Sequence, residues 1–497
     1  MTKYIPTIGL EIHAELNTKT KMFCDCINNP DESRPNINIC PICLGHPGTL
    51  PTLNKEAIKL VLKIGHAVGG TIADYTEWDR KNYFYPDIPK GYQISQYKYP
   101  LVSGGKIHSV QLTRIHLEED TGTSIHDRGD FSLLNYNRAG VPLMELVTEP
   151  VIHSAKDAAD FAKELQLLLR YLNASNANME KGEMRVEANI SVGPEDSVNS
   201  DGTVDFSKLG TKVEVKNLNS FKVVEKAINY EIERMIDLLE SGNGDEIVQE
   251  TRGWDETKQK TFSQRKKETS DDYRYFPEPD LPKLKISELP EFDADKLKSE
   301  LPELPWEKRE RFSKLNIGKD QIEIFINDFR LAKMFDDVCQ KINNQKNISE
   351  EDSKNKIKLS ANYLTTDLLS LEKTGPSNIS PENIFDLIEM ISKNEISSRG
   401  AKDILAILVK GEAAGKISNS QNLSVREVAE KHNLLQQSDT GALEEIVKNI
   451  ISNNQKVVEE YRSGKTASLQ FLIGQGMKAT KGSANPQILA EIFKKNL

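Results

Sequence analysis

Four short segments of this 497-residue chain alternate polar and apolar side chains with a period of two, and this pattern constrains the fold most. They are GLEIHAEL (residues 9–16), TRIHLEED (113–120), RVEANISV (185–192) and TKVEVKN (211–217). Successive residues of a strand point to opposite faces of a sheet, so each segment predicts one apolar and one polar face. An antiparallel sheet with one face on the core and one facing water gives this pattern.

The predicted polar faces carry Glu, His, Arg and Asn rather than mainly Thr, Ser and Lys. Glu11 and His13 are two residues apart on one face, the spacing at which strand side chains can share a cation. Oxygen ligands with one imidazole suit Mg²⁺ or Mn²⁺ better than zinc. If the strands are neighbours, the sheet presents an acidic cleft suited to a metal–phosphate complex. An ordinary solvated sheet face is the alternative, because the sequence does not show which strands are adjacent.

The N-terminal residues have neither the pattern of a secretory signal nor that of an organelle transit peptide. No apolar run approaches the roughly 18 residues that a membrane span requires. We therefore expect a cytoplasmic protein without a membrane segment, whose thiols stay reduced.

Four of the five cysteines lie within residues 24–43, as a C-x-C pair and a C-x-x-C pair separated by thirteen residues. Two close pairs joined by a short loop can offer four thiolates to one tetrahedral zinc ion. Ordinary buried thiols or a redox pair are the alternatives. We predict a structural zinc site whose ligands are Cys24, Cys26, Cys40 and Cys43. Such a site has no open coordination position, so the function must lie elsewhere.

The chain changes character near residue 290. Before this point strand and helix signals are mixed, and beyond it helical periodicity dominates. The proline-rich stretch DLPKLKISELPEFDADKLKSELPELPW at residues 280–306 marks the change.

The overall charge of the chain is acidic, unlike that of a typical nucleic-acid-binding protein. The net charge is −10, so no global signature of a nucleic-acid binder is present. Residues 455–497 depart from this, with seven Lys and Arg against three acids. Their glycine turns and lysines suit phosphate contacts, although a solvated helical surface explains them equally well.

Long motifs along essentially the whole chain resemble the B subunit of the glutamyl-tRNA(Gln)/aspartyl-tRNA(Asn) amidotransferases. In order they are GLEIHAEL, DRKNYFYPDIPKGYQISQY, HLEEDTG, EKGEMRVEANISV, KVEVKNLNSF, SDDYRYFPEPDLP and the tail GKTASLQFLIGQGMKATKGSANPQ. The resemblance implies an α+β fold: a mixed, antiparallel sheet cradle with helices and a zinc knuckle, followed by an all-α C-terminal half. We place the catalytic cradle at 1–292, a helical domain at 293–412 and a small helical tRNA-binding tail at 413–497.

The resemblance also implies the activity, that of an ATP-dependent carbon–nitrogen ligase with glutamine as amide donor. The amidase partner in a heterotrimer, which a small third subunit holds together, would release ammonia from glutamine into an internal channel. The B subunit would bind misacylated Glu-tRNA(Gln) or Asp-tRNA(Asn), activate the side-chain carboxylate with ATP as an acyl phosphate, and form the amide. ATP is then a co-substrate, Mg²⁺ neutralises charge as the phosphoryl group moves, and Zn²⁺ is structural.

The resemblance further assigns catalytic and metal positions. The expected magnesium ligands are Glu11, His13 and Glu119, and the other catalytic candidates are Glu118, Glu180, Arg185 and Glu187. Glu187 is Asp in many relatives, and a longer acid can still act as a ligand. Strict alternation, however, places Glu118 rather than Glu119 with Arg114 and His116, so the strand must end or bulge there if Glu119 is the ligand.

Substrate contacts are assigned in the same way. The expected contacts for ATP or substrate are Lys81, Asn82, Lys216 and Asn217, and those for tRNA are Lys465, Lys478 and Lys481.

Two other functions compete with this interpretation. A zinc-stabilised tRNA-binding or assembly protein without catalysis would not need the acidic set at Glu11, His13 and Glu119. A stand-alone metallohydrolase would leave the helical C-terminal half unexplained.

Overall fold

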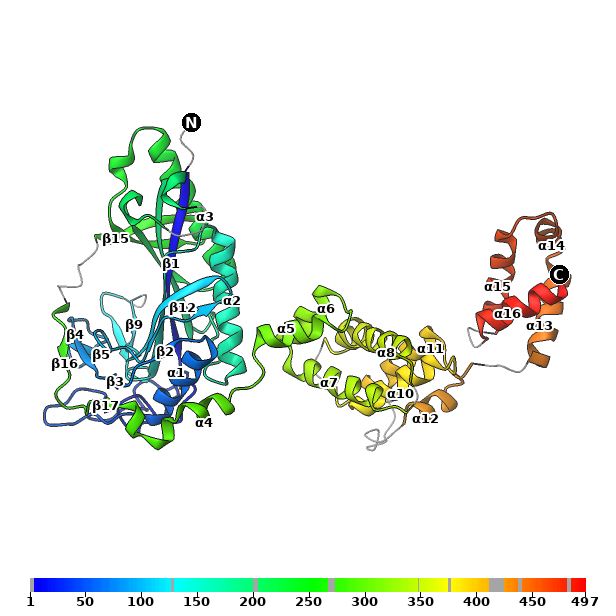
Figure 1. The fold of residues 1–497 in the computed structure, drawn as a ribbon, viewed down its shortest axis with the longest axis horizontal. Coiled ribbons are helices and arrows are strands. Elements are labelled where there is room, and N and C mark those ends of the chain that lie inside the picture. Colours follow the sequence, from blue (N-terminus) through cyan, green and yellow to red (C-terminus); the bar gives the residue numbers. More distant parts are fainter. Residues whose placement is uncertain are drawn as a thin grey trace. The chain divides into compact units, whose positions relative to one another are not determined.

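The computed structural model describes residues 4–126, 129–199, 204–266, 273–346, 348–373, 377–410, 424–436, 440–480 and 484–497. The chain forms two compact units, Met1–Pro305 and Trp306–Leu497. The strands of the described residues lie in the first unit, and the second unit is helical (Figure 1). A search of the described helices finds none long and apolar enough to cross a membrane.

One large sheet with the strand order β15-β14-β13-β12-β1-β11-β8-β6-β2 organises the first unit. Its strands are β1 (Tyr4–Glu15), β2 (Thr71–Ile72), β6 (Val102–Ser103), β8 (Val110–Glu119), β11 (Pro142–Thr148), β12 (Met184–Pro194), β13 (Val213–Leu218), β14 (Glu250–Asp255) and β15 (Lys260–Lys266), with β7 (Lys106–Ile107) paired to β8. Neighbouring strands are antiparallel, except that β13 and β14 are parallel. The four segments with period-two alternation form β1, β8, β12 and β13, which confirms the predicted sheet.

Three helices pack on the apolar face of this sheet: α1 (Lys55–Ala67), α2 (Ala155–Tyr171) and α3 (Phe221–Glu240). Leu10, Ile12 and Ala14 of β1 are fully buried, as the alternation predicts. Ser154 caps α2 by accepting a hydrogen bond from the Asp157 amide, which satisfies one of the free N–H groups of the first turn. Figure 1 shows α2 and α3 on one side of the sheet, so the other side remains for the polar side chains.

The described residues of the first unit also form three smaller sheets. They are β4–β5–β16 (Asp79–Asn82, Tyr92–Ser95 and Phe276–Pro277), β9–β10 (Thr123–Ile125 and Leu133–Asn135) and β3–β17 (Tyr75–Thr76 and Leu284–Lys285). β5 is anchored to the C-terminal end of β8, because the Gln93 side chain donates to the Glu119 carbonyl at 2.7 Å and the Leu117 amide donates to Gln96 at 3.1 Å. A last helix of this unit is α4 (Ala294–Ser299).

The second unit continues with helices to the C-terminus. They are α5 (Pro305–Ser313), α6 (Lys319–Asn327), α7 (Phe329–Asn343), α8 (Glu350–Asn362), a π-helical turn (Tyr363–Leu368), α9 (Leu369–Leu371), α10 (Pro381–Ser392), α11 (Ser398–Lys410), α12 (Val425–Lys431), α13 (Thr440–Asn453), α14 (Gln455–Arg462), α15 (Ala467–Ala479) and α16 (Pro486–Asn496). Helices α13 to α16 share a core centred on Leu472 and Phe493, both fully buried.

This arrangement confirms the α+β fold with an all-α C-terminal half. The domain boundaries stay predictions. The division between the two units follows Pro305 rather than residue 292. The predicted boundary between residues 412 and 413 lies outside the described part of the chain.

Candidate active site

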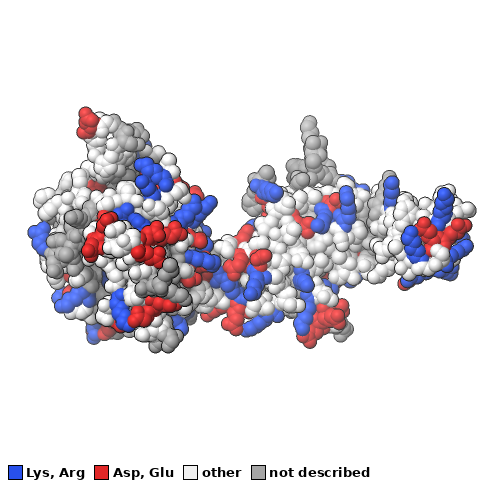
Figure 2. Space-filling model, turned by 90° about the horizontal axis from the view of Figure 1, so that it is seen from above, with Lys and Arg blue, Asp and Glu red and all other residues white. Residues whose placement is uncertain are grey.

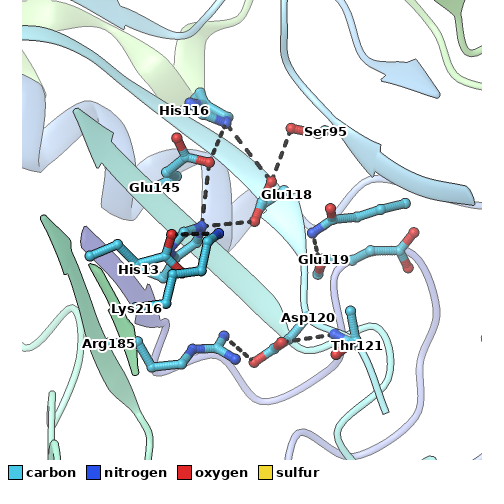
Figure 3. A network of polar contacts seen from close by, with 12 residues as sticks. His13, Ser95, His116, Glu118, Glu119, Asp120, Thr121, Glu145, Arg185 and Lys216 are labelled. Atoms are coloured by element: carbon cyan, nitrogen blue, oxygen red, sulfur yellow. Dashed lines mark hydrogen bonds and ion pairs between the residues drawn. The ribbon is translucent and has the colours of Figure 1, made fainter. Parts of the chain in front are cut away.

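A row of ionisable side chains crosses the polar face where β8, β11 and β1 are adjacent (Figure 3). The register pairs His13 with Glu145, and Glu145 with His116. The His13 Nε2 atom lies 3.4 Å from a Glu145 oxygen and 3.5 Å from a Glu118 oxygen. Ligand atoms of His13, Glu118 and Glu145 all lie within 4.8 Å of one another. We call these three residues the His13 group.

The electrostatics of the His13 group favour a bound cation. Burial acts to lower the pKa of His13, but hydrogen bonding to Glu145 and the charges of Glu145 and Glu118 raise it to about 9. Burial and the neighbouring Glu145 charge raise the pKa of Glu118. Burial opposes the ionised form of Glu145, yet the hydrogen bond from His13 and the charges of His13 and Lys81 hold its pKa well below the usual range. A divalent cation could neutralise these carboxylates in place of the His13 proton.

A second acidic set lies on the same face, across β1, β12 and β13. Glu11 is directly opposite Glu187, and ligand atoms of Glu11, Glu187 and Glu214 lie within 4.8 Å of one another. The Lys216 ammonium is 2.8 Å from Glu187 and 3.7 Å from Glu214. We call the three carboxylates the Glu11 group. One ammonium does not balance three carboxylates, and a set of hard oxygen donors suits Mg²⁺.

Two neutral side chains orient the Glu11 group. Asn189 donates to Glu11 at 2.7 Å, and the buried Thr251 hydroxyl donates to Glu214 at 2.7 Å. Carboxylates that act as metal ligands are held by outer hydrogen bonds of this kind.

Lys81 on β4 lies within range of the charges of the His13 group. Burial acts to lower the pKa of Lys81, but the Glu118 and Glu145 carboxylates are among the groups that raise it above its usual value. Its Nζ atom lies 5.1 Å from the centroid of the Tyr273 ring. Lys81 can therefore hold a negative group brought against the acidic face.

The other predicted substrate contacts have different positions. The Asn82 side chain donates to the carbonyls of Tyr273 and Arg274 at 3.3 and 2.9 Å, so it holds that segment against β4. Asn217 is exposed in a left-handed conformation (φ 63°), where the register of β12 and β13 shifts. Of the two predicted contacts on β13, Lys216 lies in the site and Asn217 does not.

The structure does not bring Glu119 to Glu11 and His13, and the assignment of the magnesium ligands stays a prediction. The Glu119 carboxylate accepts hydrogen bonds from the Lys90 ammonium at 2.7 Å and the Ile94 amide at 2.9 Å. The alternation of β8 continues to its last residues, so Glu118 takes the place beside His13. Glu145, which the sequence reasoning missed, completes the group; its signal is a single carboxylate within the apolar segment PLMELVT.

Of the remaining catalytic candidates, Arg185 lies directly opposite His13 in the register of β1 and β12, and Glu180 lies before β12 begins. Arg185 donates to Asp120 at 2.7 Å, and Arg138 lies 3.6 Å from the same oxygen. Glu180 is exposed in the turn before β12 and belongs to neither acidic group.

The four predicted zinc ligands converge. Sulfur atoms of Cys24, Cys26, Cys40 and Cys43 lie within 4.8 Å of one another, and none is in a disulfide. The Cys40 amide donates to Cys43 at 3.1 Å. A hydrogen bond from Cys24, assisted by the Lys21 charge and against the effect of burial, lowers the pKa of Cys43 to about 5. This thiolate set fits a closed zinc site.

Glycine geometry links the cysteine loop to the turn before β5. Gly45 has a φ of 67°, and a Cβ atom there would come within 2.5 Å of the Lys90 side chain. The loop thus supports Lys90, which in turn pairs with Glu119.

Two of the three predicted tRNA contacts lie in the described tail. Lys465 pairs with Glu460 at 2.9 Å, and Lys478 is in the last turn of α15. Lys481 lies outside the residues that the structure describes. Basic and acidic side chains are interspersed over the face in Figure 2, so no large region of one sign marks a binding surface there.

Comparisons with known proteins show which proteins this chain resembles. Residues 6–290 match the model of the GatB/GatE catalytic domain, and residues 333–497 match the GatB domain. The chain is 40% identical over 523 residues to the B subunit of the aspartyl/glutamyl-tRNA(Asn/Gln) amidotransferase of Crocosphaera subtropica, covering 100% of this chain and 98% of that protein. The protein of the same name from Thermodesulfovibrio yellowstonii is 40% identical over 510 residues, covering 100% and 99%. The B subunit of the chloroplastic/mitochondrial glutamyl-tRNA(Gln) amidotransferase of Oryza sativa subsp. japonica is 40% identical over 508 residues, covering 99% and 87%.

Proposed function

This chain belongs to the family of aspartyl/glutamyl-tRNA(Asn/Gln) amidotransferase B subunits, and we propose that its acidic sheet face activates and amidates a tRNA-bound carboxylate. The substrate is misacylated Glu-tRNA(Gln) or Asp-tRNA(Asn), and the co-substrate is ATP. The side-chain carboxylate attacks the γ-phosphorus of ATP and ADP leaves, which gives an acyl phosphate. Ammonia then attacks the acyl carbon, and phosphate and a proton leave as the amide forms.

The residues of the acidic face divide this work. The His13 and Glu11 groups would each hold Mg²⁺, which supplies charge neutralisation during phosphoryl transfer. Lys81 would hold the transferred group, since its ammonium lies within range of the Glu118 and Glu145 charges. His116 is buried and its pKa falls to about 4 because of that burial, so it orients Glu145 as a neutral side chain.

Ammonia must reach this face without passing through bulk water, where at neutral pH it is mostly ammonium and is not a nucleophile. An amidase partner that hydrolyses glutamine would supply it through a closed route, and a small third subunit would complete the heterotrimer. Excluding water also protects the acyl phosphate from hydrolysis.

The other parts of the chain have supporting roles in this proposal. The cysteine cluster would hold zinc and support the loop beside Lys90 and Glu119. The helical tail would bind the tRNA backbone through Lys465, Lys478 and Lys481. We expect the complex to act in the cytoplasm or, as the name of the rice relative indicates for that protein, in an organelle.

One observation carries the catalytic proposal: two sets of metal-ligating side chains lie on one sheet face that also receives Lys81. A zinc-stabilised assembly or tRNA-binding protein would need neither set.

The test uses the complete complex with its partner subunits, with ammonia in place of glutamine. ADP release and amide formation on misacylated tRNA are followed for the wild type, Glu118→Gln and Glu119→Gln. We expect Glu118→Gln to bind tRNA but to lose both reactions by at least about 100-fold. Glu119→Gln is the matched control, because it removes one carboxylate charge from the adjacent position. Full activity of Glu118→Gln would show that the His13 group is structural.

A further inference from the structure

A continuous set of five tyrosine rings runs beside the acidic face, and the assignments above leave it unused. Its members are Tyr85, Tyr83, Tyr273, Tyr275 and Tyr97, with neighbouring ring centroids 6.0, 5.8, 6.1 and 4.2 Å apart in that order. We call them the tyrosine arc. The last two rings are stacked, with an angle of 9° between their planes.

Both ends of the arc are open to solvent. Tyr85 is 50% exposed and Tyr97 is 51% exposed, whereas the three middle rings are partly buried. Phe84, between Tyr83 and Tyr85 in the chain, is 80% exposed. Exposed large rings at adjoining positions mark an interaction surface more often than they serve packing.

The arc is fixed to the acidic face at two points. Tyr97 is two residues beyond Ser95, whose hydroxyl donates to Glu118 at 3.1 Å. The Asp79 carboxylate holds the Tyr97 backbone by accepting from its amide at 3.0 Å. In the middle of the arc, the Lys81 ammonium lies 5.1 and 5.8 Å from the Tyr273 and Tyr83 ring centroids. The arc therefore leads from solvent to Lys81, which lies within range of the charges of the His13 group.

Open aromatic faces beside a cation suit unpaired nucleotides. Nucleobases stack on aromatic side chains, and RNA-binding proteins recognise single-stranded ends in this way. Lysine beside the rings attracts the phosphates that link the bases.

We propose that the tyrosine arc binds the unpaired 3′-terminal nucleotides of the aminoacyl-tRNA, with the terminal base stacked on Tyr97 or Tyr85. This inference rests on the proposed function, because the reacting carboxylate is carried by the amino acid esterified to the last nucleotide. That nucleotide must lie within the length of one amino acid from the acidic face. The arc adjoins the acidic face at two places: Lys81 lies beside its middle rings, and Ser95, near Tyr97 in the chain, donates to Glu118.

The test compares two uncharged tRNAs as competitors of the ammonia-dependent reaction, one intact and one lacking the 3′-terminal adenosine. The assembled wild-type complex should bind the intact tRNA about tenfold more tightly, since stacking of one base is worth that much. Tyr97→Ala or Tyr85→Ala, whichever ring carries the terminal base, should reduce this ratio to near one. Tyr97→Phe and Tyr85→Phe keep the ring and should keep the ratio. Phe206→Ala, at a ring that is 65% exposed outside the arc, is the matched control.

Three outcomes would overturn the proposal. The first is a ratio unchanged in both alanine variants while each unfolds cooperatively at the wild-type temperature. The second is a raised KM for ATP with the tRNA ratio unchanged, which would assign the rings to the adenine of ATP. The third is an equal loss in the phenylalanine variants, which would assign the effect to the hydroxyl groups.

Direct binding of the two tRNAs separates this inference from the proposed function. If the complex forms no ADP at all, the proposed activation fails, but the ratio of the two dissociation constants still tests the arc. If an alanine variant misfolds, Tyr97→Leu and Tyr85→Leu replace the ring with an aliphatic side chain of similar bulk, and the same ratio decides.

Discussion

His13 and Glu145 face each other across β1 and β11, with 3.4 Å between the imidazole Nε2 and a carboxylate oxygen. The proton on His13 and a divalent cation in the same place both neutralise the carboxylates, so they must compete. Because the pKa of His13 is about 9, the imidazole of the metal-free protein is protonated at neutral pH. Metal binding to the His13 group should therefore release a proton.

The first prediction follows for stability in the absence of magnesium. The folded pKa of about 9 lies above the ordinary 6.5, so protonated His13 stabilises the fold fully below pH 6.5. This contribution, about 3 kcal/mol, is lost as the pH rises through 9. Calorimetry in magnesium-free buffer should show unfolding of the first unit moving to lower temperature between these pH values. His13→Gln keeps a hydrogen-bond donor but does not titrate, and an equal pH dependence in this variant would contradict the assignment.

The same competition predicts the response of activity to magnesium. At low Mg²⁺, ADP formation should increase as the pH rises from 7 to 9, because the imidazole must lose its proton to bind metal. At saturating Mg²⁺ this increase should shrink, since mass action favours the metal-bound form. A pH profile that is independent of Mg²⁺ concentration would argue against a metal on His13.

Thr251 supports a prediction about the Glu11 group. Its hydroxyl donates to the Glu214 carboxylate at 2.7 Å, and Thr251 is 2% exposed. Thr251→Val keeps the shape but leaves Glu214 without this partner, so the apparent Mg²⁺ affinity of ADP formation should fall about tenfold. Thr251→Ser restores a hydroxyl and should recover most of it. A loss of kcat with unchanged Mg²⁺ dependence would indicate a packing role only.

Lys21 gives a prediction for the cysteine cluster. This side chain is only 1% exposed, and its ammonium donates to the carbonyls of Asn38 and Tyr136 at 2.7 and 3.2 Å. Four thiolates around Zn²⁺ carry a net negative charge that a buried ammonium balances. Lys21→Met should lose zinc to a chelator faster and destabilise the first unit by about 2 kcal/mol. Lys19→Met, outside the cluster, is the control, and equal zinc retention in both variants would remove the charge-balancing role.

The strands that the sequence predicted are those with one buried and one polar face. β11 lies between two strands and is buried on both faces along most of its length, so PLMELVT shows no alternation. Glu145 was missed for this reason. Other strands are too short for any period to be visible, because they have only two to four residues. These are β3, β4, β5, β16 and β17.

The positions of the candidate-site residues have a similar physical explanation. Glu119 was grouped with His13 from a motif, although alternation assigned it to the other face, and the structure follows the alternation. The grouping of Glu214 with Glu11 depends on β13 pairing with β12, which brings together residues about two hundred positions apart. Local patterns determine the face of each side chain, but only the strand order determines its neighbours.

The tail gives the last prediction. Helices α13 to α16 have their own apolar core, including Leu443 of α13 and Phe493 of α16. Deleting these four helices tests whether the tail binds tRNA. The deletion should remove residues 440–497, because a deletion that began at residue 455 would leave the apolar side chains of α13 uncovered. In the assembled complex the shortened chain should bind tRNA more weakly and with a smaller dependence on salt, because phosphate contacts are lost. Glutamine hydrolysis by the partner should remain.

The double variant Lys465→Gln with Lys478→Gln keeps all four helices and is the matched comparison. It should also reduce the salt dependence of tRNA binding. Unchanged tRNA affinity and salt dependence in the deletion would show that the tail does not contact the RNA.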